Sequence, residues 1–432
     1  MFNILEFFIG IICTIILIHS IFRYGLNVNV FWVAFYTFFV FFIMPNMILV
    51  LSEPLEIYSY GYTFIEDDLL VDIIYNIFIC ITFCTLYQLA KKNYKLTKRT
   101  RILTKQEYAK LLNIKLPPMV NVLIVLVSLL PLIVVILAPE PKLYFKYFAA
   151  FQMVGLAISE EALKWHVNII SNVLQVSVIA VILLWIQVPN DKSFINQCIK
   201  KIYLIIISCC ILFFSSKRTL GILLFLILLM IEVLRNKKTP WIKIVLVVSA
   251  CLGYFCVYQI IVGKTVGGGS SNIFTMYIIY FSRILDFKLA TFALIYPEKI
   301  QILDYPLQSF IFDVTFYIPR SIWIGKPYPY GVYYTAAWQN TTPLLNSFRY
   351  TVSWFGEALS NLNFWGIPIG IFFYVEGLKL IGKFRNPIVQ LYGMLTAVYF
   401  MVTHVQSNFV NIIILFVLYV FFEKKKKFTI KI

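Results

Sequence analysis

The chain has 432 residues, of which 61% are hydrophobic and 13% charged, and its mean hydropathy is +0.84. This composition excludes a soluble globular protein and indicates a membrane protein. The formal net charge is +17, and the basic residues that produce it lie in short loops and in the tail Lys424–Lys427. The chain therefore has no basic soluble domain that could bind nucleic acid.

The apolar segments predict an all-α fold, a polytopic integral-membrane helical bundle. A helix needs about 20 apolar residues to cross a bilayer, and the chain offers about 11 such segments, within a range of roughly 10 to 13. We interpret residues 1–432 as a single transmembrane domain. The predicted spans are 3–22, 30–50, 69–90, 118–138, 167–188, 202–215, 220–234, 242–261, 362–382, 388–403 and 408–422.

The basic residues predict the orientation of this bundle. If the loop 91–117 faces the cytoplasm, that side carries 25 of the 37 Lys and Arg but five of the 20 acids. The charge then divides as +20 inside and −3 outside, as the positive-inside rule requires. This orientation predicts a cytoplasmic C-terminus and an outer N-terminus.

The orientation leaves one large outer loop, residues 262–361, between two strongly apolar regions. A glycine-rich entry is followed by a stretch of helical length, 273–296, and then by prolines that forbid a long helix, so we expect short helices here. Fifteen Phe, Tyr and Trp lie between Tyr305 and Phe355. Such rings can stack on sugar faces, but they can also pack on one another or form an interfacial belt.

Cations on the outer side oppose the usual charge bias and are candidates for binding an anion. Lys217 and Arg218 occupy a short turn before a predicted span, and Arg320 and Lys326 stand among prolines in the large loop. Guanidinium groups bind phosphate in a bidentate manner. The alternatives are contact with lipid headgroups for Arg218 and an ion pair with Asp313 or Glu357 for Arg320.

Two further arginines of the loop, Arg283 and Arg349, are weaker candidates. Arg283 has a local alternative partner in Asp286, three residues along a predicted helix. Candidates for a general base are Glu357, near the end of the loop, and His404, in the last outer turn. Cys80 and Cys84 lack further ligands, so no metal site is predicted, and no span has the closely spaced charges of an ion pump.

The chain resembles the bacterial O-antigen polymerases of the Wzy class. The resemblance covers the whole topology, and its motifs are Ser215–Gly221 opening a span, Ile318-Pro319-Arg320 with Trp323 and Lys326-Pro327, and Thr351–Glu357 before the next span. It implies a metal-independent glycosyltransferase without a cofactor, which acts in lipopolysaccharide biosynthesis at the periplasmic face of the bacterial inner membrane. Its substrates would be oligosaccharide repeat units linked to undecaprenyl pyrophosphate.

The resemblance also implies roles for individual residues. Arg320 and Arg218 would stabilise the pyrophosphate leaving group, Glu357 or His404 would accept the proton of the attacking hydroxyl, and no residue would bind a metal. Partners would be the lipid-linked oligosaccharides, the bilayer and a chain-length regulator protein. The residues expected to bind substrate are Arg283, Arg349, Lys217, Lys326, Trp323, Tyr328 and Tyr330.

Three other functions fit part of the pattern. An O-antigen ligase, which transfers polymer to lipid A-core, would share the architecture and the outer arginines. A metal-assisted lipid-phosphate-sugar glycosyltransferase would use an acidic pair such as Glu66 with Asp68, but a solvated helix cap before the third predicted span explains these residues better. A lipid-linked oligosaccharide flippase would require a charged cavity within the spans and no large outer loop.

Overall fold

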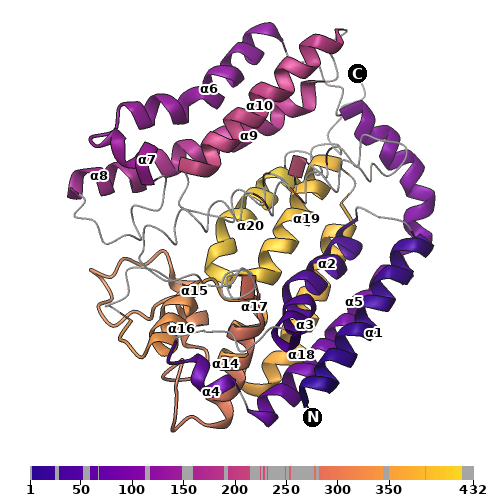
Figure 1. Ribbon diagram of the computed structural model, residues 1–432, viewed down its shortest axis with the longest axis vertical. Helices are drawn as coiled ribbons and strands as arrows, with labels where there is room; N and C mark the ends of the chain where they lie inside the picture. The colour runs from indigo at the N-terminus through magenta and orange to yellow at the C-terminus, as the bar shows by residue number, and fades with distance from the viewer. Residues whose placement is uncertain are drawn as a thin grey trace. The chain divides into compact units, whose positions relative to one another are not determined.

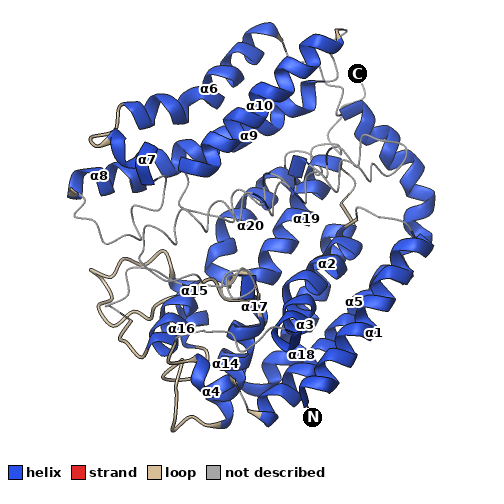
Figure 2. Ribbon diagram, in the orientation of Figure 1, coloured by secondary structure: helices blue, strands red, loops and turns tan. Residues whose placement is uncertain are grey.

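The computed structural model is helical throughout the residues it describes, 81% of them in helices and none in strands (Figure 2). It describes residues 2–24, 29–51, 59–66, 68–111, 117–147, 159–188, 193–214, 282–343, 350–384 and 386–420, with isolated residues between 224 and 278. The expected α-helical membrane protein is therefore confirmed as a class.

The chain divides into two compact units, residues 1–100 with 272–432, and residues 101–271. In the first unit, long helices lie side by side (Figure 1). Its elements are α1 (Phe2–Tyr24), α2 (Val30–Phe38), the π-helix η1 (Phe39–Ile43), α3 (Met44–Leu51), α4 (Tyr62–Ile65), most of α5 (Leu69–Leu111), α14 (Ile284–Ile295), α15 (Gln308–Thr315), α16 (Tyr330–Gln339), α17 (Trp354–Leu362), the 3₁₀ turn η5 (Asn363–Trp365), α18 (Gly366–Gly382), α19 (Pro387–Val402) and α20 (Val405–Tyr419).

The second unit is a smaller helical group around one apolar core. Buried side chains of the long helices, such as Val135, Leu174 and Ile211, pack together at its centre. Beside them Tyr144 bonds His166 through its hydroxyl at 2.9 Å from Nδ1. The elements are α6 (Pro118–Ile136), α7 (Pro141–Tyr147), α8 (Glu160–Trp165), the π-helix η3 (His166–Ile170), α9 (Ser171–Gln187) and α10 (Phe194–Phe214).

Six helices in the described residues are long and apolar enough to cross a membrane. Three shorter apolar helices coincide with predicted spans, and the predicted spans 220–234 and 242–261 lie almost wholly outside the described residues. The number 11 therefore stays a prediction. The six are Glu6–Tyr24, Val30–Leu49, Leu69–Tyr94, Pro118–Ile136, Ile195–Phe214 and Trp354–Gly382.

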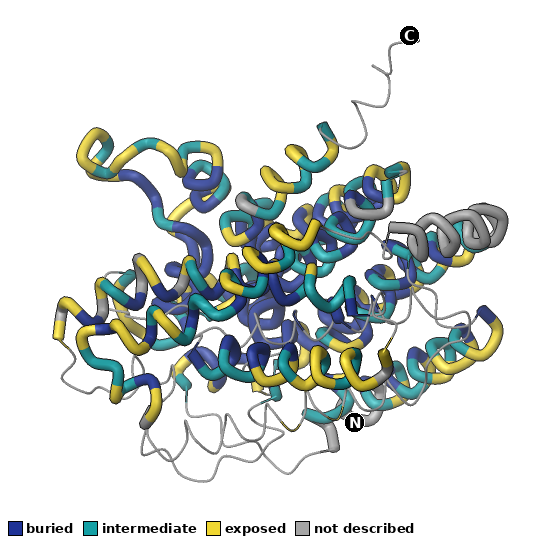
Figure 3. The backbone as a smooth tube through the Cα atoms, turned by 90° about the horizontal axis from the view of Figure 1, so that it is seen from above, coloured by how far each residue is buried: buried dark blue, intermediate teal, exposed yellow. Residues whose placement is uncertain are grey.

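These helices carry exposed apolar side chains, and Figure 3 shows exposed and buried positions alternating along helical turns. Ile12, Ile15, Ile77 and Ile81 are each about half exposed or more. In a soluble protein such a surface would be an aggregation hazard, but it is the surface that a bilayer covers. The sixth of these segments, Trp354–Gly382, contains both α17 and α18. The end of the expected outer loop and the start of the predicted span 362–382 therefore form one apolar stretch.

A proline in the second predicted span accounts for a contact between the start of α14 and the helix around η1. Pro45 has no N–H and cannot donate to the carbonyl of Phe41, and the helix adopts π geometry just before it. The backbone N–H of Arg283 donates to Phe41 O at 2.9 Å, and the Tyr75 hydroxyl donates to Phe42 O at 2.7 Å. Carbonyls at a distorted membrane helix need such outside donors, and this need fixes where α14 begins.

Three charged side chains from distant parts of the chain meet in the interior of the first unit. Lys288 of α14 lies 2.6 Å from an Asp72 oxygen and 3.5 Å from a Glu6 oxygen, and all three residues are less than 10% exposed. Asn76 donates to the same Glu6 oxygen at 3.3 Å. We call Glu6, Asp72 and Lys288 the buried charge triad. It holds α14 against α1 and α5.

Two glycines of α18 form a matched pair for testing the close packing of α17 against α18. A methyl group on Gly366 would overlap the backbone of Ala358, whereas one on Gly377 would meet nothing within 4 Å. We expect Gly366→Ala to destabilise the protein by about 1–3 kcal/mol, because backbone must move. Gly377→Ala should be neutral or slightly stabilising. Thermal unfolding in detergent measures both, and equal melting temperatures for the two variants would contradict this packing.

Candidate functional site

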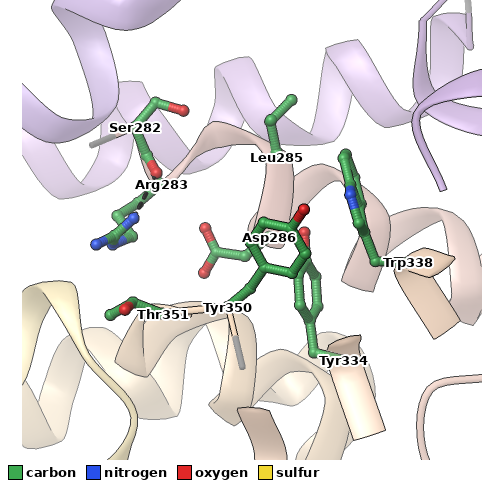
Figure 4. Close-up of a pocket in the computed structure, with 8 residues that line it drawn as sticks. All are labelled: Ser282, Arg283, Leu285, Asp286, Tyr334, Trp338, Tyr350 and Thr351. Atoms are coloured by element: carbon green, nitrogen blue, oxygen red, sulfur yellow. Dashed lines mark hydrogen bonds between the residues drawn. The ribbon is translucent and has the colours of Figure 1, made fainter. Parts of the chain in front are cut away.

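The start of α14 forms one wall of a small pocket, about 20 Å³ in volume, which is room for one water molecule (Figure 4). Its polar groups come from Arg283 and Asp286, and its aromatic groups come from α16 and from the segment before α17. A cavity of this size with polar groups in its wall suits one bound water molecule and is too small for a sugar ring. The lining residues are Ser282, Arg283, Leu285, Asp286, Tyr334, Trp338, Tyr350 and Thr351.

Arg283 is buried and bonded to backbone carbonyls. Its Nε donates to Val402 O and its Nη1 to Ser282 O, both at 2.7 Å. The expected ion pair with Asp286 is not formed, since no oxygen of Asp286 lies within 4 Å of the guanidinium. Burial lowers the pKa of Arg283, although the negative charge of Asp286 opposes this effect. Arg283 therefore anchors the end of α19.

Asp286 faces the start of α17. Its Oδ2 accepts the backbone N–H of Ser353 at 2.5 Å, and it also lies close to Gly356. Burial raises the pKa of Asp286 to about 6, against the opposing effects of Arg283 and of the Ser353 bond. The carboxyl group beside the pocket therefore has a pKa above its ordinary value.

The turn between α19 and α20 carries His404 and is held from two sides. Arg283 bonds Val402 O before the turn, and the backbone N–H of Val405 donates to Glu357 Oε2 at 2.8 Å after it. Asn408 closes the turn by donating to the carbonyl of His404 at 3.0 Å. His404 itself is 8% exposed, and its ring lies against Gly331 of α16. The structure thus brings together Glu357 and His404, the two predicted bases.

Glu357 is fully buried at the centre of a polar network between α15 and α17. Its Oε1 accepts the hydroxyl of Ser309 at 3.0 Å, while Oε2 accepts Val405 N–H. Asn361, one turn further along α17, donates to Ser309 Oγ at 2.7 Å. Both oxygens of Glu357 therefore already accept hydrogen bonds. Because the carboxylate is fully buried and bonded to Val405, it is placed to hold the His404 turn.

The cations Arg320 and Lys326 stabilise the loop between α15 and α16. Arg320 donates to the carbonyls of Lys326 and Pro327 at 2.6 and 2.7 Å, and its guanidinium carbon lies 3.8 Å from the centre of the Tyr328 ring. Lys326 Nζ donates to two carbonyls of the same loop at 2.9 Å. No carboxylate of the described chain lies within 4 Å of either cation. The ion pairs of Arg320 with Asp313 or Glu357 are therefore absent.

The two positive charges affect each other. The pKa of Lys326 is lowered first by burial and second by the charge of Arg320. Arg320 is half-buried. An anion bound beside both cations would relieve this repulsion.

The remaining predicted residues differ in accessibility. Trp323 and Tyr328 are half-buried and belong to the same loop as Arg320. Tyr330 is fully buried, and its hydroxyl bonds Ser360 at 2.8 Å, so its ring contacts protein. Lys217, Arg218 and Arg349 lie outside the described residues.

Sequence reasoning missed the role of several polar residues. Asp286 and Asp313 were considered as ion-pair partners of arginines, whereas they contact α17. Ser309 and Asp313 stand four residues apart, a spacing that places both on one helical face. That signal is present in the sequence, but it does not say which element faces it.

No family model, no curated protein and no solved structure matches this chain. Within the described residues, no group of three or more His, Cys, Asp or Glu side chains is placed to hold a metal ion.

Proposed function

We propose that this protein is an O-antigen or polysaccharide polymerase. It would join oligosaccharide repeat units carried on undecaprenyl pyrophosphate by metal-independent glycosyl transfer at the periplasmic face of the bacterial inner membrane. The apolar helices support a membrane location. The choice of this family rests on the motifs around Arg320 and Glu357.

The observation that carries the proposal is the pair of cations, Arg320 and Lys326. Both are held by backbone carbonyls, and neither is neutralised by an acid of the described chain. In transfer from a lipid pyrophosphate, negative charge develops on the leaving group, and fixed cations in a poorly hydrated site stabilise it. Loop carbonyls keep Arg320 in place before the substrate arrives, which lowers the reorganisation needed.

The roles of the two predicted bases can be separated on geometric grounds. Glu357 is fully buried and its Oε2 accepts the N–H of Val405, so in this proposal it positions the turn of His404. His404 then accepts the proton of the attacking sugar hydroxyl. Arg283 holds the other end of the turn, and the pocket with Asp286, Tyr334 and Trp338 lies beside it. The substrate-binding roles of Lys217, Arg218 and Arg349 rest on the sequence, because all three lie outside the described residues.

A flippase for lipid-linked oligosaccharides is the second candidate, and the buried charge triad favours it. Buried charges near membrane helices are costly and often serve transport. Glu6 and Asp72 belong to two such helices, which the sequence alone did not bring together. The triad also has a structural role, because it holds α14 against α1 and α5, and this role does not require transport.

A strain that lacks the gene tests the proposal through the ladder of its lipopolysaccharide on a gel. We expect core capped by a single repeat, and a full ladder when the gene is restored. Bare core with polymer retained on the lipid carrier would identify an O-antigen ligase. Bare core with single repeats on the carrier would identify a flippase, and either result would overturn the proposal.

A further inference from the structure

Two carboxyl groups meet inside the first unit, away from the pocket of Arg283. Asp313 of α15 is 5% exposed and Glu357 of α17 is 0% exposed. Ser309, one turn before Asp313, donates to Glu357 Oε1 at 3.0 Å, so this face of α15 is turned toward Glu357. The two carboxyl groups are near enough for a hydrogen bond once one of them carries a proton.

Asp313 is the unexplained member of this pair. Neither of its oxygens accepts a hydrogen bond from any donor in the described residues. A buried polar atom without a partner costs about 1–3 kcal/mol, and a charged one costs more. A buried carboxylate beside a second carboxylate is therefore unfavourable as long as both are ionised.

The surroundings supply no positive charge in contact with the pair. The titratable groups around it are Lys326 from the loop, Tyr330 from α16 and His404 from the turn before α20. Lys326 Nζ is directed to loop carbonyls, and the Tyr330 hydroxyl bonds Ser360. His404 bonds within its own turn, to Ser407 Oγ at 3.2 Å from Nε2. Within the described residues, no Lys, Arg or His nitrogen lies within 4 Å of an oxygen of either carboxyl group.

We propose that Asp313 and Glu357 form a proton-binding site in which one proton is shared between the two carboxyl groups. When the proton is on Asp313, the Asp313 hydroxyl donates to Glu357. The single negative charge then lies on the Glu357 carboxylate, which also accepts the Ser309 Oγ–H and the Val405 N–H. Burial first, and the Glu357 charge second, raise the pKa of Asp313.

The proton stabilises the fold and, through it, the turn of His404. A carboxyl group whose pKa is raised on folding binds its proton more tightly in the folded state. The free energy of unfolding therefore falls as the pH rises above about 4, the pKa of an aspartate in the unfolded chain. Loss of the proton would place two adjacent charges between α15 and α17. Glu357 would then hold Val405 less firmly, and His404 is the residue before it.

The pH dependence of thermal unfolding tests this site in the purified full chain in detergent, between pH 5 and pH 9. We expect the wild-type melting temperature to fall toward pH 9. Asp313→Asn keeps a neutral donor facing Glu357, so it should flatten this slope and melt at or above the wild type at pH 9. Asp304→Asn is the control, because Asp304 is exposed and lies just before α15, and asparagine keeps a side-chain oxygen that can accept Gln308 Nε2. Its slope should match that of the wild type.

Infrared spectroscopy gives a readout that a purely structural role would not change. At neutral pH the carbonyl stretch of a protonated carboxylic acid should be present in the wild type and in Asp304→Asn, and reduced in Asp313→Asn. An equal loss of melting temperature at every pH for Asp313→Asn, with an unchanged infrared band, would show that Asp313 is ionised and that no shared proton exists.

Discussion

Replacing Lys288 with methionine should destabilise the folded protein by about 3–5 kcal/mol, the usual effect of removing one member of a buried ion pair. Lys288 faces Asp72 at 2.6 Å and Glu6 at 3.5 Å, and its loss leaves two buried carboxyl groups without their cation. The effect is measured as a fall in the melting temperature of the purified protein. It should be accompanied by lower expression, because α14 loses its attachment.

The chain offers a matched control in Lys379, which pairs with Glu376 at the same distance, 2.6 Å, but with both side chains more than 40% exposed. Lys379→Met should change stability by no more than about 1 kcal/mol. Neutralising the whole triad, with Glu6→Gln and Asp72→Asn added to Lys288→Met, should recover much of the loss. If Lys288→Met and Lys379→Met melted alike, the triad would not hold α14.

Replacing Arg320 with alanine should lower the rate of polymer formation by about 10²–10³-fold, the effect of removing one donor to a developing negative charge. Arg320→Lys keeps the positive charge but loses the two guanidinium hydrogen bonds to the loop carbonyls. We therefore expect a rate between those of the wild type and of Arg320→Ala. The rates are measured with purified variants on lipid-linked repeat units at saturating concentration.

Lys299 provides the control for Arg320. Its ammonium lies 4.6 Å from the centre of the Tyr296 ring, so it is also a cation beside a tyrosine in the outer loop, but it is exposed. Lys299→Ala should keep the wild-type rate. A structural defect in Arg320→Ala would lower the melting temperature and would be relieved at low temperature, whereas loss of charge stabilisation would persist. Wild-type activity in Arg320→Ala would remove the main support for the proposed function.

The positions of most described spans could be predicted because the length of an apolar segment is a local property. Predicted segments such as 3–22, 69–90 and 118–138 coincide with long helices. The short helices of the outer loop also follow from local rules, since prolines between 297 and 343 interrupt any longer helix. The predicted span 362–382 begins too late, because the apolar stretch already starts with α17 at Trp354. The polar residues Glu357 and Asn361 made this part of the sequence resemble a loop.

The contacts that build the candidate site could not be predicted in the same way. Lys288 and Asp72 are 216 residues apart, and Arg283 and Val402 are 119 apart. A sequence shows that such residues are polar and lie near apolar segments, but their pairing depends on how the helices pack. Arg283 illustrates this limit. The nearby Asp286 was the obvious partner, yet the carbonyl at the end of α19 accepts its Nε.

The most direct test of the proposed function uses the purified protein alone, in liposomes that contain undecaprenyl-pyrophosphate-linked repeat units and a chelator. Mass spectrometry of the lipid-linked products measures the number of repeats on each carrier. We expect products with two or more repeats, together with free undecaprenyl pyrophosphate, and we expect the chelator to have no effect. Repeat units that stay single in the presence of folded protein would contradict the assignment as a polymerase.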